Sequence, residues 1–272
     1  MLGQRRLLDD IEELGKNFPR FAILVGAKGS GKKMVAQRVA KQLGAHLVTV
    51  ETKVVNIREA VDMAYKQKSP ILYLIPDTDH MSPAAKNALL KVTEEPPRQA
   101  YFILTVENLG NTLATIQSRG TVFHMYPYSP RDLKKYAKSL YDVNEQELEI
   151  LVNVCITPGE ISKVVGSNIL GFYEYVEKVV SNIGEVSGAN AFKIADALKF
   201  KDGDPGYDVI LFLRAVMYYY TKQALTTDQN PIWLFKSVGV TSACLRDMRI
   251  NGINRRSLFD MWILDIRQIW RS

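Results

Sequence analysis

The stretch that decides the fold is residues 21–33, FAILVGAKGSGKK. Its first five residues are apolar without polar alternation, and this pattern predicts a strand that is buried on both faces. A glycine-rich run follows, and apolar residues at helical spacing continue over residues 32–43. A strand, a glycine-rich turn and a helix in this order can bind phosphate, because backbone N–H groups and the helix N-terminus converge on the phosphate oxygens. The predicted phosphate loop, which would hold a nucleotide, comprises Gly26, Ala27, Lys28, Gly29, Ser30, Gly31, Lys32 and Lys33.

Further apolar runs at residues 71–75 and 101–105 predict two more buried strands, and weaker candidates lie at residues 46–50 and 122–125. Helical patterns alternate with these strands. Strands that alternate with helices favour a parallel sheet with right-handed crossovers, so we expect an α/β core. The helices of this core are predicted at residues 2–15, at 32–43, at 57–66 and from Ser82-Pro83 to a point before Pro96.

No strand is predicted after residue 126, and the rest of the chain is expected to be helical. Helix starts at Ser129-Pro130, Asn144 and Thr157-Pro158 predict a small helical unit that ends near residue 183, and the polar residues 184–188 resemble a linker. Longer helices are predicted at about residues 190–199, 207–224 and 257–270. We therefore expect three parts, which comprise residues 1–127, 128–184 and 188–272.

The composition is that of a globular protein and excludes disorder or a coiled-coil rod, because 47% of the 272 residues are hydrophobic and 24% are charged. The net charge of +6 permits contact with a polyanion without establishing it. The two cysteines, Cys155 and Cys244, form no CxxC motif, which excludes a disulfide framework and a four-cysteine zinc site. No apolar run is long enough to span a membrane, so we expect a cytoplasmic protein without membrane contact.

Three features around the phosphate loop argue against efficient hydrolysis of a nucleotide. Lys33 stands where a hydroxyl normally binds Mg²⁺, and an ammonium group cannot ligate a cation. After the second buried strand, Pro76 and Asp77 stand where phosphate-loop ATPases carry an Asp for the metal and a Glu for water. Asp77 is thus a degenerate version of the catalytic acid. We expect weak binding of ATP or ADP, no Mg²⁺ and no zinc.

Two alternatives for these residues remain open at this stage. Asp77 and Asp79 could form a metal pair, although a solvated turn accounts for them equally well. Lys33 could instead lie near phosphate as a counter-charge. The lone His80 favours a surface position over a functional one.

Three later stretches carry a resemblance to a known family: residues 82–97 (SPAAKNALLKVTEEPP), residues 101–105 (YFILT) and residues 113–120 (LATIQSRG). These motifs closely resemble the clamp-loader family of AAA+ proteins, whose members open and load the sliding clamp of a replicative DNA polymerase. The resemblance covers residues 1 to about 130, and more weakly the helical unit that follows. It implies an AAA+ core, a helical lid at residues 128–184 and a helical collar at residues 188–272 through which subunits oligomerise.

The resemblance also assigns roles to individual residues. Arg119 matches the arginine finger that acts in trans on the nucleotide of a neighbouring subunit, although Gly120 replaces the cysteine that normally follows it. Ser162 stands where active members carry a nucleotide-sensing arginine in the lid. The run TPGE at residues 157–160 is more similar to the delta-prime type, a non-motor subunit of the DNA polymerase III loader. The implied partners are other loader subunits in a hetero-oligomer, the sliding clamp and primer–template DNA.

One departure from the family is that the four-cysteine zinc module found in many bacterial members is missing. The first hypothesis is a non-motor clamp-loader subunit with a degenerate ATP site and an arginine finger. The alternative is an active AAA+ ATPase, a motor subunit or another DNA-remodelling ATPase, in which Lys32, Asp77 and Asp79 share the catalytic work. A third hypothesis is a diverged AAA+ fold that serves as an isolated binding module.

Overall fold

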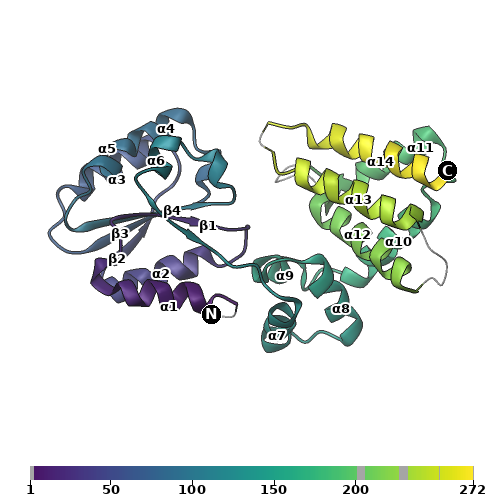
Figure 1. The fold of residues 1–272 in the computed structure, drawn as a ribbon, viewed down its shortest axis with the longest axis horizontal. Helices are drawn as coiled ribbons and strands as arrows, with labels where there is room; N and C mark the ends of the chain where they lie inside the picture. The colour runs from purple at the N-terminus through teal and green to yellow at the C-terminus, as the bar shows by residue number, and fades with distance from the viewer. Residues whose placement is uncertain (1–2, 201–205, 227–231, 251, 272) are drawn as a thin grey trace. The chain divides into compact units, whose positions relative to one another are not determined.

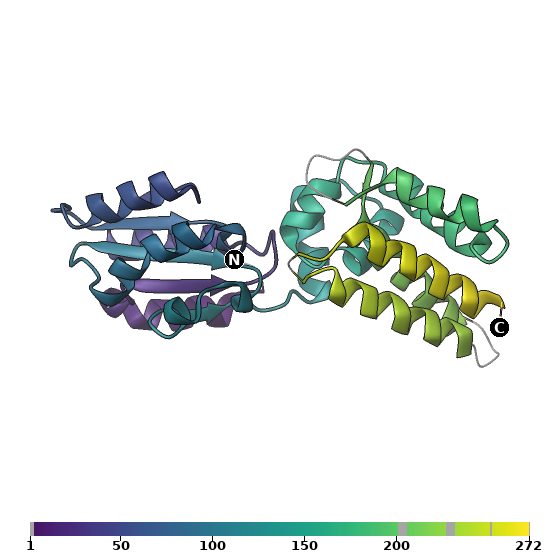
Figure 2. The ribbon, with the colours of Figure 1, turned by 90° about the horizontal axis from the view of Figure 1, so that it is seen from above.

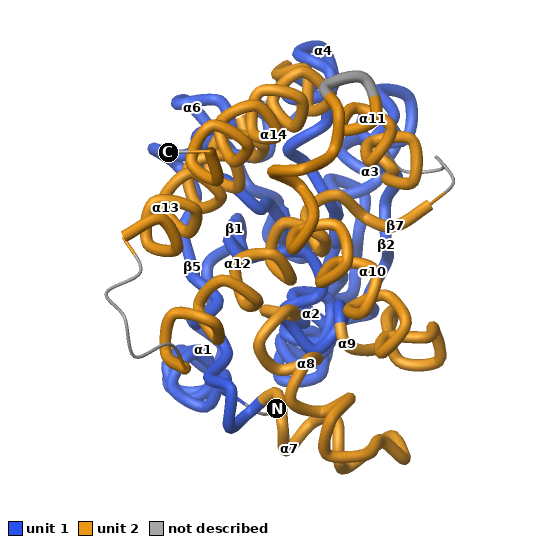
Figure 3. The backbone as a smooth tube through the Cα atoms, turned by 90° about the vertical axis from the view of Figure 1, so that its right-hand side faces the viewer, with its two compact units in different colours: residues 1–132, 157–160 blue, residues 133–156, 161–272 orange. Residues whose placement is uncertain are grey.

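A computed structural model describes residues 3–200, 206–226, 232–250 and 252–271. The chain forms two compact units (Figure 3). Unit 1 comprises Met1–Asp132 and Thr157–Glu160, and unit 2 comprises Leu133–Ile156 and Ile161–Ser272. The chain therefore enters unit 2, returns to unit 1 for four residues, and enters unit 2 again.

Unit 1 is built on a parallel sheet with the strand order β2-β3-β4-β1-β5 (Figures 1 and 2). Every residue of β3 and β4 is buried, as expected for strands covered on both faces. All five apolar runs form strands, so the predicted α/β core is confirmed. The strands are β1 (Phe21–Val25), β2 (His46–Thr49), β3 (Ile71–Ile75), β4 (Ala100–Val106) and β5 (Thr121–His124).

Helices cover both faces of this sheet and bury two apolar cores. On one face lie α1 (Arg5–Leu14) and α2 (Lys32–Leu43), and on the other lie α3 (Val54–Ala64), α4 (Pro83–Ala88), α5 (Leu90–Glu94) and α6 (Ala114–Gln117). Short 3₁₀ helices complete the unit: η1 (Gly15–Asn17), η2 (Thr78–His80) and η3 (Leu109–Asn111).

The helix predicted after Ser82 begins as expected, because the Ala85 N–H donates to Ser82 Oγ at 3.2 Å. It differs from the prediction in being divided at Leu89 into α4 and α5. The second half ends at Glu94, before Pro96, as predicted.

Unit 2 is mainly helical, and its three long helices α12, α13 and α14 lie side by side (Figure 1). Trp262 is almost fully buried, and its indole N–H donates to Thr241 Oγ1 at 3.0 Å. The helices of this part of the chain are α7 (Pro130–Leu140), α8 (Glu145–Val154), α9 (Pro158–Val164), α10 (Ile169–Asn182), α11 (Gly188–Phe192), η4 (Lys193–Ala197), α12 (Val209–Thr226), α13 (Ile232–Asp247) and α14 (Arg255–Arg271).

Two sequence predictions for unit 2 were wrong. A parallel pair of two-residue strands, β6 (Leu198–Lys199) and β7 (Tyr207–Asp208), contradicts the expectation that no strand follows residue 126. It also ends the helix expected to reach residue 199, because the 3₁₀ turn η4 stops at Ala197. In addition, α13 was not predicted.

Other predictions lie outside what the structure describes or stay untested. The first predicted helix begins at residue 2, which lies outside the described residues, and α1 begins at Arg5. The predicted boundary between lid and collar falls inside unit 2 and stays a prediction. Across the described ranges, the helices are too short or too polar to cross a membrane.

Candidate functional site

The glycine-rich stretch between β1 and α2 forms a tight loop at the N-terminus of a helix. Gly29 and Gly31 have φ of +80° and +93°, a region that favours glycine. Gly26 leaves no room for a side chain, because a Cβ atom there would lie 2.6 Å from Met125 Cβ. The structure thus places the eight predicted loop residues around one helix terminus, the arrangement that binds phosphate.

Lys32, the first residue of α2, lies folded into this loop. Its Nζ donates to the carbonyl oxygens of Gly26 at 2.5 Å and Ala27 at 3.1 Å. Burial lowers the pKa of the Lys32 ammonium, while the nearby carboxylates, Glu107 foremost, oppose this shift. The ammonium already has oxygen partners inside the loop, so a bound phosphate would take the place of these carbonyls. Lys33, by contrast, is exposed.

The loop fits a phosphate group better than it fits a magnesium ion. Ser30 Oγ is buried and has no hydrogen-bond partner among the described residues, so it leaves one hydroxyl unsatisfied at the loop. Lys32 and the N-terminus of α2 supply positive charge beside it. For magnesium, however, residue 33 offers an ammonium and residue 76 a proline. Within the described ranges, no group of three or more His, Cys, Asp or Glu side chains is arranged to hold a metal ion.

Asp79, which follows β3, is a buried carboxylate with a structural set of partners. Its oxygens accept hydrogen bonds from the backbone N–H groups of Glu107 at 2.7 Å and Asn108 at 3.0 Å, and from Asn111 Nδ2 at 3.1 Å. These bonds join the end of β3 to the loop after β4. Because both oxygens are engaged, Asp79 serves the fold, which weakens the alternative of a metal pair with Asp77.

Asp77, the predicted degenerate catalytic acid, is exposed and has an unusual backbone. Its φ of +51° is the only positive value at a non-glycine position among the described residues. Its N–H donates to Thr105 Oγ1 at 3.1 Å, which links β3 to β4. His80 is exposed, in agreement with the surface position that was favoured for it.

Glu107 is a residue that the sequence reasoning missed. It follows β4, and β4 pairs with β1 so that Val106 lies opposite Val25. The Gly26 N–H donates to the Val106 carbonyl at 3.0 Å, so the residue after Val106 lies next to the phosphate loop. A predicted strand order that placed β4 next to β1 could have identified Glu107, because the carboxyl ends of neighbouring parallel strands lie at one edge of a sheet.

Arg119, the predicted finger, lies just after α6 and is exposed. Its Nη1 donates to the Thr115 carbonyl at 3.0 Å, and its Nη2 lies 3.3 Å from Glu94 Oε1. Gly120 follows in close contact with β1, since a Cβ atom there would lie 3.1 Å from side-chain atoms of Phe21 and Ile23. The guanidinium is therefore held at the surface of unit 1 by α5 and α6.

A second set of contacts that the sequence did not reveal involves the TPGE run. Thr157 Oγ1 donates to the Lys28 carbonyl at 2.9 Å, and the Gly159 N–H donates to the Gly29 carbonyl at 3.0 Å. Residues 157–160 thus pack on the phosphate loop within unit 1. Ser162, which the resemblance matches to the position of a sensing arginine, lies in unit 2 with its Oγ 2.8 Å from the hydroxyl of Tyr136.

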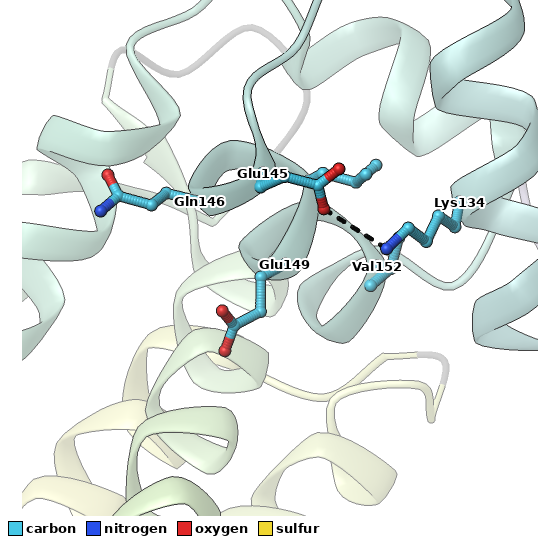
Figure 4. A pocket seen from close by; sticks show the side chains of 6 residues that line it. Lys134, Glu145, Gln146, Glu149 and Val152 are labelled. Atoms are coloured by element: carbon cyan, nitrogen blue, oxygen red, sulfur yellow. Dashed lines mark hydrogen bonds and ion pairs between the residues drawn. The ribbon is translucent and has the colours of Figure 1, made fainter.

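A hollow of about 290 Å³ in unit 2 contains none of the predicted site residues (Figure 4). Its carboxylates are already paired. Glu145 bonds with Lys134, and Glu149 accepts a hydrogen bond from Tyr218 at 2.5 Å, which lowers the pKa of Glu149. We assign no function to this hollow.

The sheet order and the loop together define the fold class. A parallel sheet in the order β2-β3-β4-β1-β5, with a phosphate loop after β1, is the architecture of AAA+ proteins. A variant of RuvB from Thermotoga maritima shares this fold, with a TM-score of 0.51 over 99% of this chain and 87% of that chain, at 13% sequence identity.

Sequence comparisons identify relatives of this chain. Residues 48–129 match the family described as DNA polymerase III, delta subunit. The DNA polymerase III subunit gamma of Buchnera aphidicola subsp. Schizaphis graminum is 27% identical over 190 residues, which cover 56% of this chain and 52% of the relative. The subunit delta' of Buchnera aphidicola subsp. Acyrthosiphon pisum is 25% identical over 187 residues, which cover 66% of this chain and 56% of the relative.

These matches confirm the resemblance to the AAA+ clamp-loader family that the motifs indicated. The chain spans about half the length of the curated relatives it matches.

Proposed function

We propose that this chain is a non-motor, delta-prime-like subunit of a DNA polymerase III clamp loader, in which Arg119 acts on the nucleotide of a neighbouring subunit. The observation that carries this proposal is the contrast between two sites on unit 1. The phosphate loop lacks ligands for magnesium at positions 33 and 76, while the guanidinium of Arg119, which follows α6, is exposed.

The chain's own site supports binding of phosphate without hydrolysis. Lys32, the left-handed glycines and the N-terminus of α2 can hold the phosphates of ATP or ADP. Magnesium, when bound in a phosphate-loop ATPase, neutralises charge that develops on the phosphates. Here an ammonium at Lys33 repels a cation, and Asp77 is too short to orient water as a glutamate would. We therefore infer weak nucleotide binding and little intrinsic turnover.

The geometry of Arg119 suits a role in trans. A guanidinium carries five N–H donors in a planar fork, and only some of them face Thr115 and Glu94. The remaining donors are available to a phosphate outside this chain. Because the guanidinium stays charged at every physiological pH, it would stabilise the negative charge on a γ-phosphate during hydrolysis by the neighbour.

Unit 2 supports the proposal that the chain works in a hetero-oligomer. Four large apolar side chains are more than half exposed on two of its helices: Ile232 and Phe235 on α13, and Met261 and Leu264 on α14. The two residues of each pair are three positions apart, so they are neighbours on one helix face, and contiguous exposed apolar patches are typical of protein interfaces. We propose that they contact other loader subunits in the cytoplasm, and that the sliding clamp and primer–template DNA are engaged by the assembled complex.

The test is Arg119→Ala in a loader complex reconstituted with its partner subunits. We expect the ATPase stimulation that this chain gives its neighbour to fall about tenfold or more, since fingers contribute at least that much. Arg119→Lys keeps the charge without the planar fork and should restore only part of the stimulation.

Stability provides the control. The Arg119–Glu94 pair is exposed, so Arg119→Ala should cost less than about 1 kcal/mol in free energy of unfolding, measured by urea denaturation. Full stimulation by a folded Arg119→Ala variant would contradict the proposed finger.

The alternative is an active AAA+ ATPase, which is favoured by the buried Lys32 in the loop and by the exposed Asp77 after β3. Steady-state phosphate release by the chain alone separates the two. We expect no turnover above background. Turnover that Lys32→Ala abolishes would establish the alternative instead.

A further inference from the structure

Three consecutive carbonyl groups of the phosphate loop accept hydrogen bonds from outside the loop. The Lys28 carbonyl accepts from Thr157 Oγ1 at 2.9 Å, and the Gly29 carbonyl accepts from the Gly159 N–H at 3.0 Å. The next carbonyl, that of Ser30, accepts from the Tyr128 hydroxyl at 2.8 Å. We call Tyr128, Thr157 and Gly159 the loop clasp; all three belong to unit 1.

In the clasp, the backbone at Gly159 lies so close to the backbone at Gly29 that no side chain fits between them. A Cβ atom at Gly159 would lie 2.5 Å from Gly29 Cα and 3.0 Å from Gly29 O. A Cβ atom at Gly29 would in turn lie 2.8 Å from Thr157 Oγ1. The atoms that would collide at Gly159 are backbone atoms, which cannot move aside as a flexible side chain can. Glycine is therefore required on both sides of this contact.

The clasp has a direct consequence for the amides that face a phosphate. In a trans peptide unit the carbonyl and the following N–H point in opposite directions. A carbonyl that is held toward the clasp therefore aims the next N–H away from it. In this way the clasp orients the N–H groups of Gly29 and Gly31, which lie in the loop at the N-terminus of α2, while the Ser30 N–H donates to the Ala27 carbonyl at 3.2 Å within the loop.

We propose that Thr157, Gly159 and Tyr128 are positioning residues, which hold the phosphate loop in its anion-binding shape when no nucleotide is bound. The ligand class is the phosphate group itself, in inorganic pyrophosphate or in the triphosphate of ATP without metal. The proposal deepens the inferred binding of phosphate by this loop. It does not depend on partner subunits or on Arg119.

Coupling between clasp and ligand follows from reciprocity. If the clasp favours the loop conformation that binds phosphate, then bound phosphate must favour the closed clasp by the same factor. Breaking the clasp should therefore weaken phosphate binding and loosen the loop in the absence of ligand.

The experiment uses the full chain and two matched pairs of variants. Gly159→Ala places a methyl group against Gly29, whereas Gly239→Ala adds a methyl group in α13 where nothing lies within 4 Å. Thr157→Val removes the hydroxyl that donates to Lys28, whereas Thr157→Ser keeps it. Tyr128→Phe removes the third hydrogen bond independently of residues 157–160.

Hydrogen exchange of the peptide that covers residues 26–33 is the first readout. We expect about fivefold faster exchange there in Gly159→Ala, Thr157→Val and Tyr128→Phe, because one hydrogen bond of about 1 kcal/mol holds each carbonyl. Exchange in the control variants Gly239→Ala and Thr157→Ser should equal that of the unaltered chain.

Titration with pyrophosphate and with metal-free ATP, followed by calorimetry, is the second readout. We expect several-fold weaker binding in the three clasp variants and unchanged binding in the two controls.

Two results would overturn the proposal. Unchanged exchange at residues 26–33 in folded Gly159→Ala and Thr157→Val variants would show that the loop keeps its shape without the clasp. If hydrogen exchange in peptides of β3 and β4 accelerates as much as it does at residues 26–33, the variants have lost stability in general and the clasp has no positioning role. If Gly159→Ala does not fold, the comparison of Thr157→Val with Thr157→Ser decides. A clasp that fails these tests leaves the Arg119 experiment unaffected.

Discussion

Asp79 lies beside a phosphate loop, yet its surroundings assign it to the fold. The carboxylate is 7% exposed and accepts two backbone N–H groups and one side-chain amide. Charge-assisted bonds of this kind are stronger than neutral ones. Asp79 therefore fixes the loop after β4, and with it the position of Glu107 next to Lys32.

Asp79→Asn tests this role at the level of one residue. The substitution replaces an accepting oxygen by an NH₂ group that faces backbone donors, so we expect a loss of about 2–3 kcal/mol in free energy of unfolding. Asp77→Asn is the matched control, because Asp77 is exposed and should change stability by less than about 0.5 kcal/mol. Urea denaturation of both variants gives the comparison. Equal effects of the two substitutions would contradict a structural role for Asp79.

Some site residues could be predicted from the sequence and others could not, for a physical reason. The phosphate loop is local, so its glycines and Lys32 were identified from spacing alone. The clasp residue Thr157 donates to a carbonyl 129 positions earlier in the chain, and Tyr128 to one 98 positions earlier. A contact between such distant residues depends on the packed fold and leaves no periodic signal. The prediction that Arg119 is a finger rests only on a family motif and stays a prediction.

At the scale of elements, the central strands β1, β3 and β4 were predicted best because nearly all of their residues are buried. Helix α2 has the predicted bounds, Lys32–Leu43, since Gly31 and Gly44 flank it with left-handed backbones. Helix α13 was missed because it carries few charged residues, and small polar side chains such as Ser237 and Thr241 occupy its buried face. Without a strong contrast between its faces, the helix has no clear apolar period.

The buried polar face of α13 leads to a prediction about the packing of α13 on α14. Thr241 Oγ1 accepts the indole N–H of Trp262 and donates to the Ser237 carbonyl at 2.7 Å. Thr241→Val leaves the indole N–H buried without an acceptor, so we expect a loss of about 1–3 kcal/mol in free energy of unfolding. Thr241→Ser keeps the hydroxyl and should lose less. Chemical denaturation checks this, and equal losses in both variants would rule out the hydrogen bond as the cause.

At the scale of the whole molecule, unit 2 exposes large apolar side chains on α13 and α14. Phe235 is 60% exposed although it lies on a helix with a well-buried opposite face. Placing a charge there should disturb assembly without disturbing the monomer, because an exposed position tolerates polar side chains.

Phe235→Asp therefore should weaken association with partner loader subunits at least about tenfold while the melting temperature changes little. Phe235→Leu keeps the position apolar and serves as the control. Association is measured by co-purification and by titration of tagged partners. Undiminished association of Phe235→Asp would show that this face of α13 lies outside the interface.

The path of the chain between the two units restricts how the protein can change in evolution. Residues 133–156 belong to unit 2, but Thr157–Glu160 belong again to unit 1 and contact Gly29. Residues 133–156 therefore form an insert that is preceded and followed by segments of unit 1. A gene fragment that stops at Asp132 would encode all five strands of the sheet yet lack two of the donors on its phosphate loop. Insertions and deletions in residues 133–156 are tolerated only where Thr157–Glu160 can still contact Gly29.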